Sequence, residues 1–424
     1  MELTIIRRHC RGLLAMLLLV LSASVAWAQS SAVYTATGID VDITGDIATL
    51  RDQALIEGQR KALQKVLADI APAERVASLT LPSDDIISTW VQDFEIEQEK
   101  SSATHYIGRF TFRFLADPVQ QYLAGNRVEF AQTQTKRLLV LPVYTDETGN
   151  SNLWGPANLW LAQWSLKAPN VSLVPMVLPT GDVSDTSTLS ATQALAGDLP
   201  RLTALAQRYG AGDVLVTEVK ASPPGADGKQ NFAISATRYG REAPNSFTDS
   251  VSGDATTIDD LLGQSADRTI AWVQGQWKQA NLVDASKQST MTIEVPVGNL
   301  KQWVDIKKQL GGVPSLKSVR LISLTRTLAI LDISFLGDLP QFQRALAQQD
   351  LSLAMAIGDP TKGTLRQDAN ASATVLPEPA PLPMPMNQPP QNQPPQNQPP
   401  LNQPGYQAAS RRCPISLPCR NNPA

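Results

Sequence analysis

Apolar residues between positions 33 and 356 switch repeatedly between two spacings, and this pattern constrains the fold more than any single motif does. Apolar residues two apart are typical of half-buried strands, whereas apolar residues three or four apart are typical of amphipathic helices. Runs of both kinds follow one another along the chain, separated by glycine, proline and other turn-forming residues. The sequence therefore predicts a multidomain fold of mixed α+β and α/β class.

The first group of elements predicts a small α+β domain. Its predicted strands cover 33–43, 94–101 and 105–114, and its predicted helices cover 50–70 and 84–91. Thr49 is the predicted N-cap of the long helix, with Asp52 at the third helical position. Gly58 inside that helix costs stability relative to alanine, so it indicates close contact with a neighbouring element.

The second group predicts an α/β domain, because strands and helices alternate. Its predicted strands cover 136–144, 171–178, 213–219 and 230–239, and its predicted helices cover 198–210 and 257–279. The first strand contains LLVLPV, which is apolar at every position and is typical of a strand buried on both faces.

Three tryptophans follow this strand and raise the question of a core or a binding surface. Pro156 and Asn158 indicate the start of a helix, in which Trp160 and Trp164 lie four residues apart on one face. We expect these two rings to cover the apolar strand, although an aromatic sugar platform is the alternative. Trp154 precedes the proline, so we expect it to be the most accessible of the three and the candidate contact for a ligand or partner.

The third group has the order β-α-β-β-α-β, which predicts a ferredoxin-like domain. Its predicted strands cover 290–297, 318–325, 328–337 and 351–357, and its predicted helices cover 299–312 and 339–349. From Asp359 onward the composition becomes rich in proline and glutamine, with NQPPQ repeating from Asn387, which predicts a disordered tail that acts as a spacer or a docking segment.

The first residues have the form of a secretory leader. Arg7, Arg8 and Arg11 precede an uncharged apolar run, and Ala26-Trp27-Ala28 offers the small residues that a signal peptidase requires. We expect export to the periplasm with a mature N-terminus at Gln29, whereas a retained leader would associate the protein with the membrane. The predicted layout is a signal peptide at 1–28, an α+β domain at 29–130, an α/β domain at 131–285, a ferredoxin-like domain at 286–358 and the tail at 359–424.

Residues typical of catalysis and metal binding are scarce. The chain has two histidines, of which His9 belongs to the leader, so a site with two histidine ligands is excluded from the mature protein and no metal or other cofactor is predicted. Asp182 and Asp185 are the pair considered for a carboxylate-based hydrolase, although two carboxylates in a polar loop usually form a turn and a cap. The net charge of −3 makes nucleic acid an unexpected partner. Cys413 and Cys419 are a disulfide candidate in an oxidising compartment, with free or intermolecular thiols as the alternative.

Several motifs, taken in order, resemble one family. LRDQALIEGQRKALQKVL, RLLVLPVY, WGPANLWLAQW, LVPMVLPTGDVSD and LAQRYGAGDVLV follow one another as in the proteobacterial exported proteins of the domain-of-unknown-function 2066 family. The resemblance covers roughly residues 30–355 and implies an envelope protein with no established activity.

These observations favour a non-enzymatic protein. We expect a periplasmic scaffold or adaptor of the cell envelope that binds another envelope protein or a cell-wall component through its domains or its tail. A carbohydrate or cell-wall ligand-binding module is the alternative, and a carboxylate-based cell-wall hydrolase is the third reading.

Overall fold

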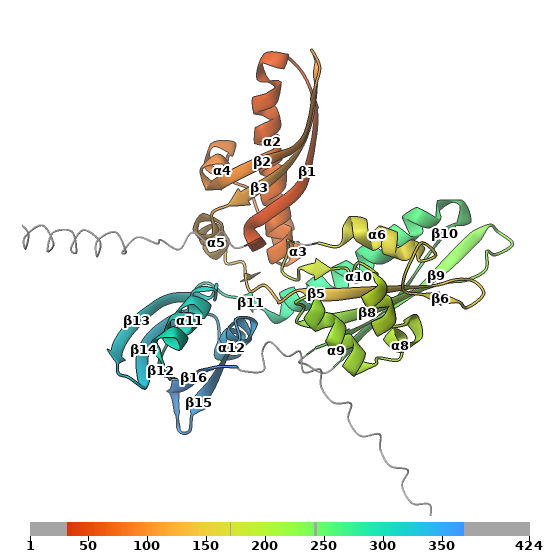
Figure 1. Ribbon diagram of the computed structural model, residues 1–424. Coiled ribbons are helices and arrows are strands. Elements are labelled where there is room, and N and C mark those ends of the chain that lie inside the picture. Colours follow the sequence, from red (N-terminus) through yellow and green to blue (C-terminus); the bar gives the residue numbers. More distant parts are fainter. Residues whose placement is uncertain (1–31, 170, 241–243, 369–424) are drawn as a thin grey trace, which may run out of the picture. The chain divides into compact units, whose positions relative to one another are not determined.

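The computed structural model describes residues 32–169, 171–240 and 244–368 (Figure 1). These residues form a mixed α/β structure with several separate sheets. The chain divides into two units, residues 1–377 and 378–424, and all described residues lie in the first. The leader and the cysteine pair Cys413 and Cys419 lie outside the described residues.

The first sheet contains three antiparallel strands in the order β1-β3-β2. They are β1 (Thr35–Thr44), β2 (Val91–Ser101) and β3 (His105–Phe114), accompanied by α2 (Ile47–Ile70), α3 (Ala73–Ala77), α4 (Asp84–Trp90) and α5 (Ala116–Gly125). The predicted close contact at Gly58 is confirmed, because a Cβ there would lie 3.0 Å from the ring of Phe112 on β3. The predicted cap is wrong. The side chain of Asp46 caps α2 by accepting a hydrogen bond from the Ala48 N–H, so the helix begins before Thr49.

The second sheet has the order β10-β9-β8-β5-β6, with β7 also paired to β5. Its strands are β5 (Leu138–Thr145), β6 (Ser151–Asn152), β7 (Met176–Val177), β8 (Asp213–Ala221), β9 (Lys229–Tyr239) and β10 (Asn245–Asp254). Its helices are α6 (Leu159–Lys167), α7 (Val183–Thr188), α8 (Ala191–Leu195), α9 (Leu199–Arg208) and α10 (Ile258–Ala280). A further pair, β4 (Phe130–Ala131) and β11 (Leu282–Val283), forms a separate two-stranded sheet.

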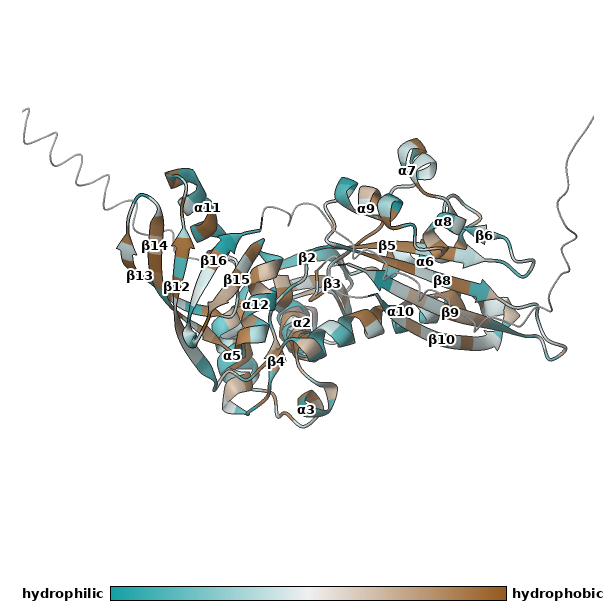
Figure 2. Ribbon diagram, turned by 90° about the horizontal axis from the view of Figure 1, so that it is seen from below, coloured by the Kyte–Doolittle hydropathy of each residue, from teal (hydrophilic) through white to brown (hydrophobic). Residues whose placement is uncertain are grey.

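Strand β5 is buried along its whole length, as its composition predicted. Figure 2 shows the apolar character of this strand. Leu138 and Val140 belong to one apolar cluster with residues of α6 and α10, whereas Leu139 and Leu141 belong to a second cluster with residues of α8 and α9. Helices therefore cover both faces of this strand. The predicted strand at 171–178 is wrong except for Met176–Val177, and β10 was not predicted, because its only large apolar residues are Phe247 and Val251.

The third sheet has the order β13-β14-β12-β16-β15. Its elements are β12 (Gln288–Pro296), α11 (Leu300–Gly311), β13 (Leu316–Leu324), β14 (Leu328–Leu336), α12 (Leu339–Gln348), β15 (Leu351–Ala356) and β16 (Asp359–Gln367). The predicted order of six elements is present, and β16 is added between β12 and β15, parallel to β12. The predicted start of the disordered tail at Asp359 is therefore wrong. Strand β16 is mostly polar, but its Leu365 is fully buried, and one such residue gives no periodic signal.

Candidate functional site

The two helical tryptophans belong to the core, as predicted. Trp160 and Trp164 are fully buried, with their ring centroids 5.8 Å apart in an edge-to-face arrangement. The Trp160 indole N–H donates a hydrogen bond of 3.1 Å to the Leu262 carbonyl on α10. The Asn158 side chain caps α6 by accepting a hydrogen bond from the Leu161 N–H, which places both rings over β5.

Trp154 is the most accessible of the three tryptophans, but it is half-buried rather than free. Its indole N–H donates a hydrogen bond of 2.7 Å to the Leu189 carbonyl, and its ring packs on the apolar cluster around α8 and α9. Gly181 lies close to the same ring, in a backbone conformation with φ of +70° that favours glycine. These contacts hold the loop that contains Trp154 against the domain, so the ring has a structural role.

The carboxylates of Asp182 and Asp185 also have structural partners. Asp182 caps α7 by accepting a hydrogen bond from the Asp185 N–H, which holds the pKa of the Asp182 carboxyl below its ordinary value, and Arg208 pairs with it. Asp185 is completely buried and accepts hydrogen bonds from the Gly181 N–H at 2.9 Å and the Tyr209 hydroxyl at 2.6 Å. A substrate cannot reach a side chain with no exposed surface. Asp182 therefore serves as a helix cap, and Asp185 as a buried hydrogen-bond acceptor that holds the loop.

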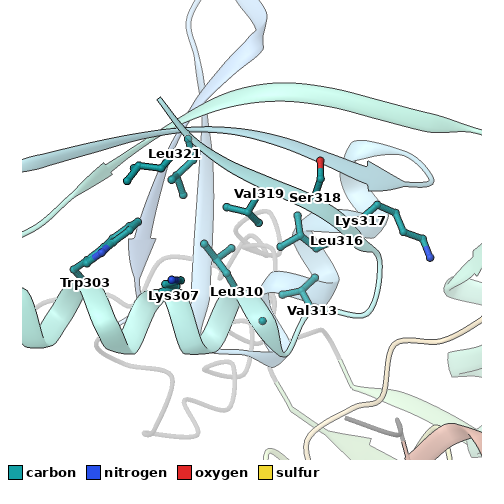
Figure 3. A pocket seen from close by; sticks show the side chains of 11 residues that line it. Trp303, Lys307, Leu310, Val313, Leu316, Lys317, Ser318, Val319 and Leu321 are labelled. Atoms are coloured by element: carbon teal, nitrogen blue, oxygen red, sulfur yellow. The ribbon is translucent and has the colours of Figure 1, made fainter. Parts of the chain in front are cut away.

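An open apolar groove lies between α11 and β13 (Figure 3). It encloses about 580 Å³, within the range typical of ligand sites. Leu316, Val319 and Leu321 of β13 point toward the helix, and Trp303 and Leu310 of α11 point back toward the strand. Asn299 caps the helix by accepting from the Gln302 N–H, which fixes where α11 starts and therefore which of its residues face the strand.

The groove is open because β13 is the last strand of its sheet and α11 does not cover it completely. Val319 and Leu321 remain 45% and 48% exposed, although their pairing partners Ile333 and Leu331 on β14 are buried. On the helix, Leu300 and Val304 are also exposed, next to the half-buried Trp303. A contiguous apolar surface of this kind marks a contact site more often than scattered single residues do.

Basic side chains border this apolar surface. Residues 299–326 contain six lysines or arginines and one aspartate, in a chain whose net charge is −3. Lys307 and Lys317 line the groove, and Lys317 also donates a hydrogen bond to the Gln120 side chain. Lys307 forms no ion pair with any residue in the described part of the chain. The groove therefore combines an apolar floor with a positive potential.

Sequence reasoning missed this groove. The alternating apolar residues in 318–325 predicted a strand, but the letters alone cannot show that a helix leaves this strand partly uncovered. The available signal was the excess of basic residues around that strand and helix, because charges of one sign beside an apolar run indicate a rim.

Comparisons with known proteins assign no family to the chain. No protein-family model matches the sequence, and no curated protein matches it. Two solved structures cover about a third of the chain: the lipoprotein GNA1162 from Neisseria meningitidis (12% identity, 33% of this chain and 99% of that chain, TM-score 0.22) and an uncharacterized protein (12%, 34% and 93%, TM-score 0.18). A formyltetrahydrofolate deformylase from Pseudomonas putida KT2440 has 11% identity over 56% of this chain and 92% of that chain, with a TM-score of 0.15. These similarities are too low to assign a fold or a function.

Two properties of the described residues concern other classes of function. No group of three histidine, cysteine, aspartate or glutamate side chains in the described ranges is arranged to hold a metal ion. None of the helices in those ranges has the length and apolar character needed to cross a membrane.

Proposed function

We propose that this protein is a non-enzymatic scaffold or adaptor of the cell envelope that binds another envelope component in the groove between α11 and β13. The observation that carries the proposal is the groove itself, where exposed Val319 and Leu321 face Trp303 under a basic rim. Burying such a surface against a partner removes apolar area from water and stabilises the complex by about 25 cal/mol for each Å².

Export to the periplasm is part of the same proposal. It is supported by the basic, apolar and small-residue regions of the leader, ending at Ala28. Membership of the domain-of-unknown-function 2066 family is also proposed, on the order of the motifs between residues 30 and 355. The proline- and glutamine-rich tail gives reach to the folded part, as a spacer or a second docking segment.

For the finer fold, we propose that residues 286–367 form a ferredoxin-like domain with one inserted strand. The βαββαβ order and the antiparallel pairing of β12 and β13 with β14 support this assignment. The first two domains would then cover 29–130 and 131–285. In this layout the groove lies at the open edge of the last domain, next to the tail in sequence.

The alternatives depended on side chains that have internal partners. A sugar-binding platform needs exposed aromatic rings, whereas Trp160 and Trp164 are buried and Trp154 is bonded to the Leu189 carbonyl. A hydrolase needs two accessible carboxylates, whereas Asp185 has no exposed surface. In the groove, by contrast, Val319 and Leu321 remain exposed.

Co-purification from envelope extract tests the proposal. Tagged full-length protein is compared with a Val319→Asp variant and with Val183→Asp, a control at an apolar residue of α7 that is 85% exposed. We expect one set of envelope components to be retained by the wild type and the control and lost from the groove variant. Equal recovery with all three proteins would refute docking in the groove.

A further inference from the structure

We infer that the groove receives an extended segment of a partner protein, which adds to the sheet as a strand beside β13, with apolar side chains in the groove and acidic side chains on the opposite face, beside Arg320. This inference rests on the proposed function and names the chemistry of the partner. It requires an open strand edge, a groove beside that edge, a matching length and a matching charge.

The open edge is the outer side of β13. This strand pairs with β14 on one side, and no strand among the described residues pairs with it on the other. The backbone N–H and C=O groups on an unpaired edge are hydrogen-bonding groups that another extended chain can satisfy. An added strand gains these main-chain hydrogen bonds without any requirement on its sequence.

The groove supplies the sequence preference. In an extended chain alternate side chains point to the same face, so every second residue of the added strand points toward α11. There it meets Trp303 and Leu310 on the helix and the exposed faces of Val319 and Leu321 on β13 (Figure 3). Apolar residues at these alternate positions bury their own surface and that of the groove.

Irregularities in β13 limit the length of the added strand. The pairing with β14 shifts at Lys317 and again at Ile322, each of which is an extra residue in a β-bulge. Between them Ser318–Leu321 pairs one-to-one with Leu331–Ser334. At about 3.3 Å for each residue, this regular stretch accommodates roughly 13 Å of partner chain. The partner segment is therefore short.

The positive charge around the groove favours an acidic partner segment over a second copy of this chain. Lys301, Lys307 and Lys308 on α11 form no ion pair with any described residue, and Arg320 on β13 has only Asp332. Two copies joined at β13 would bring these basic rims together, which is unfavourable. In a segment that alternates apolar and acidic residues, the apolar set fills the groove, and the acidic set points to the other face of β13, beside Arg320, where it lowers the positive potential of the site.

Fluorescence anisotropy tests the inference with the full mature chain. The probe is a labelled eight-residue peptide of alternating valine and glutamate, compared with a form N-methylated at alternate residues and with a form in which lysine replaces glutamate. We expect binding of the first peptide only, with each change weakening it by at least about tenfold, because N-methylation removes two or three hydrogen bonds and lysine meets like charge. Val319→Asp should also weaken binding at least about tenfold. Lys307→Glu should weaken it about threefold, whereas Lys220→Glu, a charge control on β8, should not.

Four outcomes would overturn the inference. Equal binding of the N-methylated peptide would show that the edge of β13 is not used. Binding to vesicles with anionic lipid, lost in Val319→Asp while the peptide does not bind, would assign the groove to a membrane surface. Dimerisation in sedimentation experiments, lost in the same variant, would assign it to a second copy. If the peptide does not bind but co-purification still depends on Val319, docking in the groove stands. Only the inference of strand addition is then refuted.

Discussion

Replacing Trp160 with alanine tests whether the tryptophans of α6 are core residues. The side chain is fully buried against Trp164, and its N–H bonds the Leu262 carbonyl. Truncating a buried tryptophan to alanine costs about 3–5 kcal/mol, because the ring's burial is lost and a cavity remains. With a urea m-value of about 2 kcal/mol per M, a loss of about 4 kcal/mol lowers the unfolding midpoint by about 2 M.

The assay is urea unfolding of the full chain followed by far-ultraviolet circular dichroism, since the substitution removes a fluorophore. Trp160→Phe keeps an aromatic ring but loses the hydrogen bond, so we expect a smaller loss of about 1–2 kcal/mol. Leu166→Ala is the matched control, because Leu166 lies on the same helix and is 81% exposed. Its expected effect is within about 0.5 kcal/mol. A folded Trp160→Ala variant with the midpoint of the wild type would refute the core assignment.

Three further predictions concern a buried carboxylate, an exposed carboxylate and a disulfide. Asp185→Ala should lower the free energy of unfolding in urea by at least about 3 kcal/mol, because the Gly181 N–H and the Tyr209 hydroxyl lose their acceptor. An unchanged unfolding midpoint would mean that this carboxyl is solvated. The Thr361 side chain and backbone hydrogen bonds lower the pKa of Asp359 from 3.8 to about 2, so their contribution to stability is present above the ordinary pKa and is lost as the pH falls through about 2. An NMR titration should give that midpoint, and Thr361→Ala should raise it; equal midpoints would contradict this cause. Non-reducing peptide mapping should find Cys413 joined to Cys419, and free thiols would disprove the pairing.

Much of the secondary structure could be predicted because its signals are local. The apolar run of β5 predicted burial on both faces, and the spacing of Trp160 and Trp164 predicted one buried helix face. Elements with few apolar residues were missed for the same reason. Strand β10 is an edge strand with a polar face, and β16 is recognisable only through its neighbours β12 and β15.

The candidate site depends on tertiary structure and could not be predicted in the same way. Whether Val319 belongs to a core or a groove depends on how far α11 extends over the sheet, which the sequence of β13 does not encode. The sequence indicated Asp185 as a candidate for hydrolysis and Trp154 as a candidate contact for a ligand or partner. In the structure, Asp185 accepts a hydrogen bond from Gly181 and Trp154 donates one to Leu189. Only the charge pattern around residues 299–326 carried information about the groove.

Photo-crosslinking in cells tests the central claim most directly. A photoreactive phenylalanine analogue replaces Val319 in the groove, and in a parallel strain it replaces Val183 on α7. We expect a discrete crosslinked product at Val319 that is absent at Val183 and weakened by Lys307→Glu. No product at Val319, or the same products at both positions, would contradict a docking site between α11 and β13.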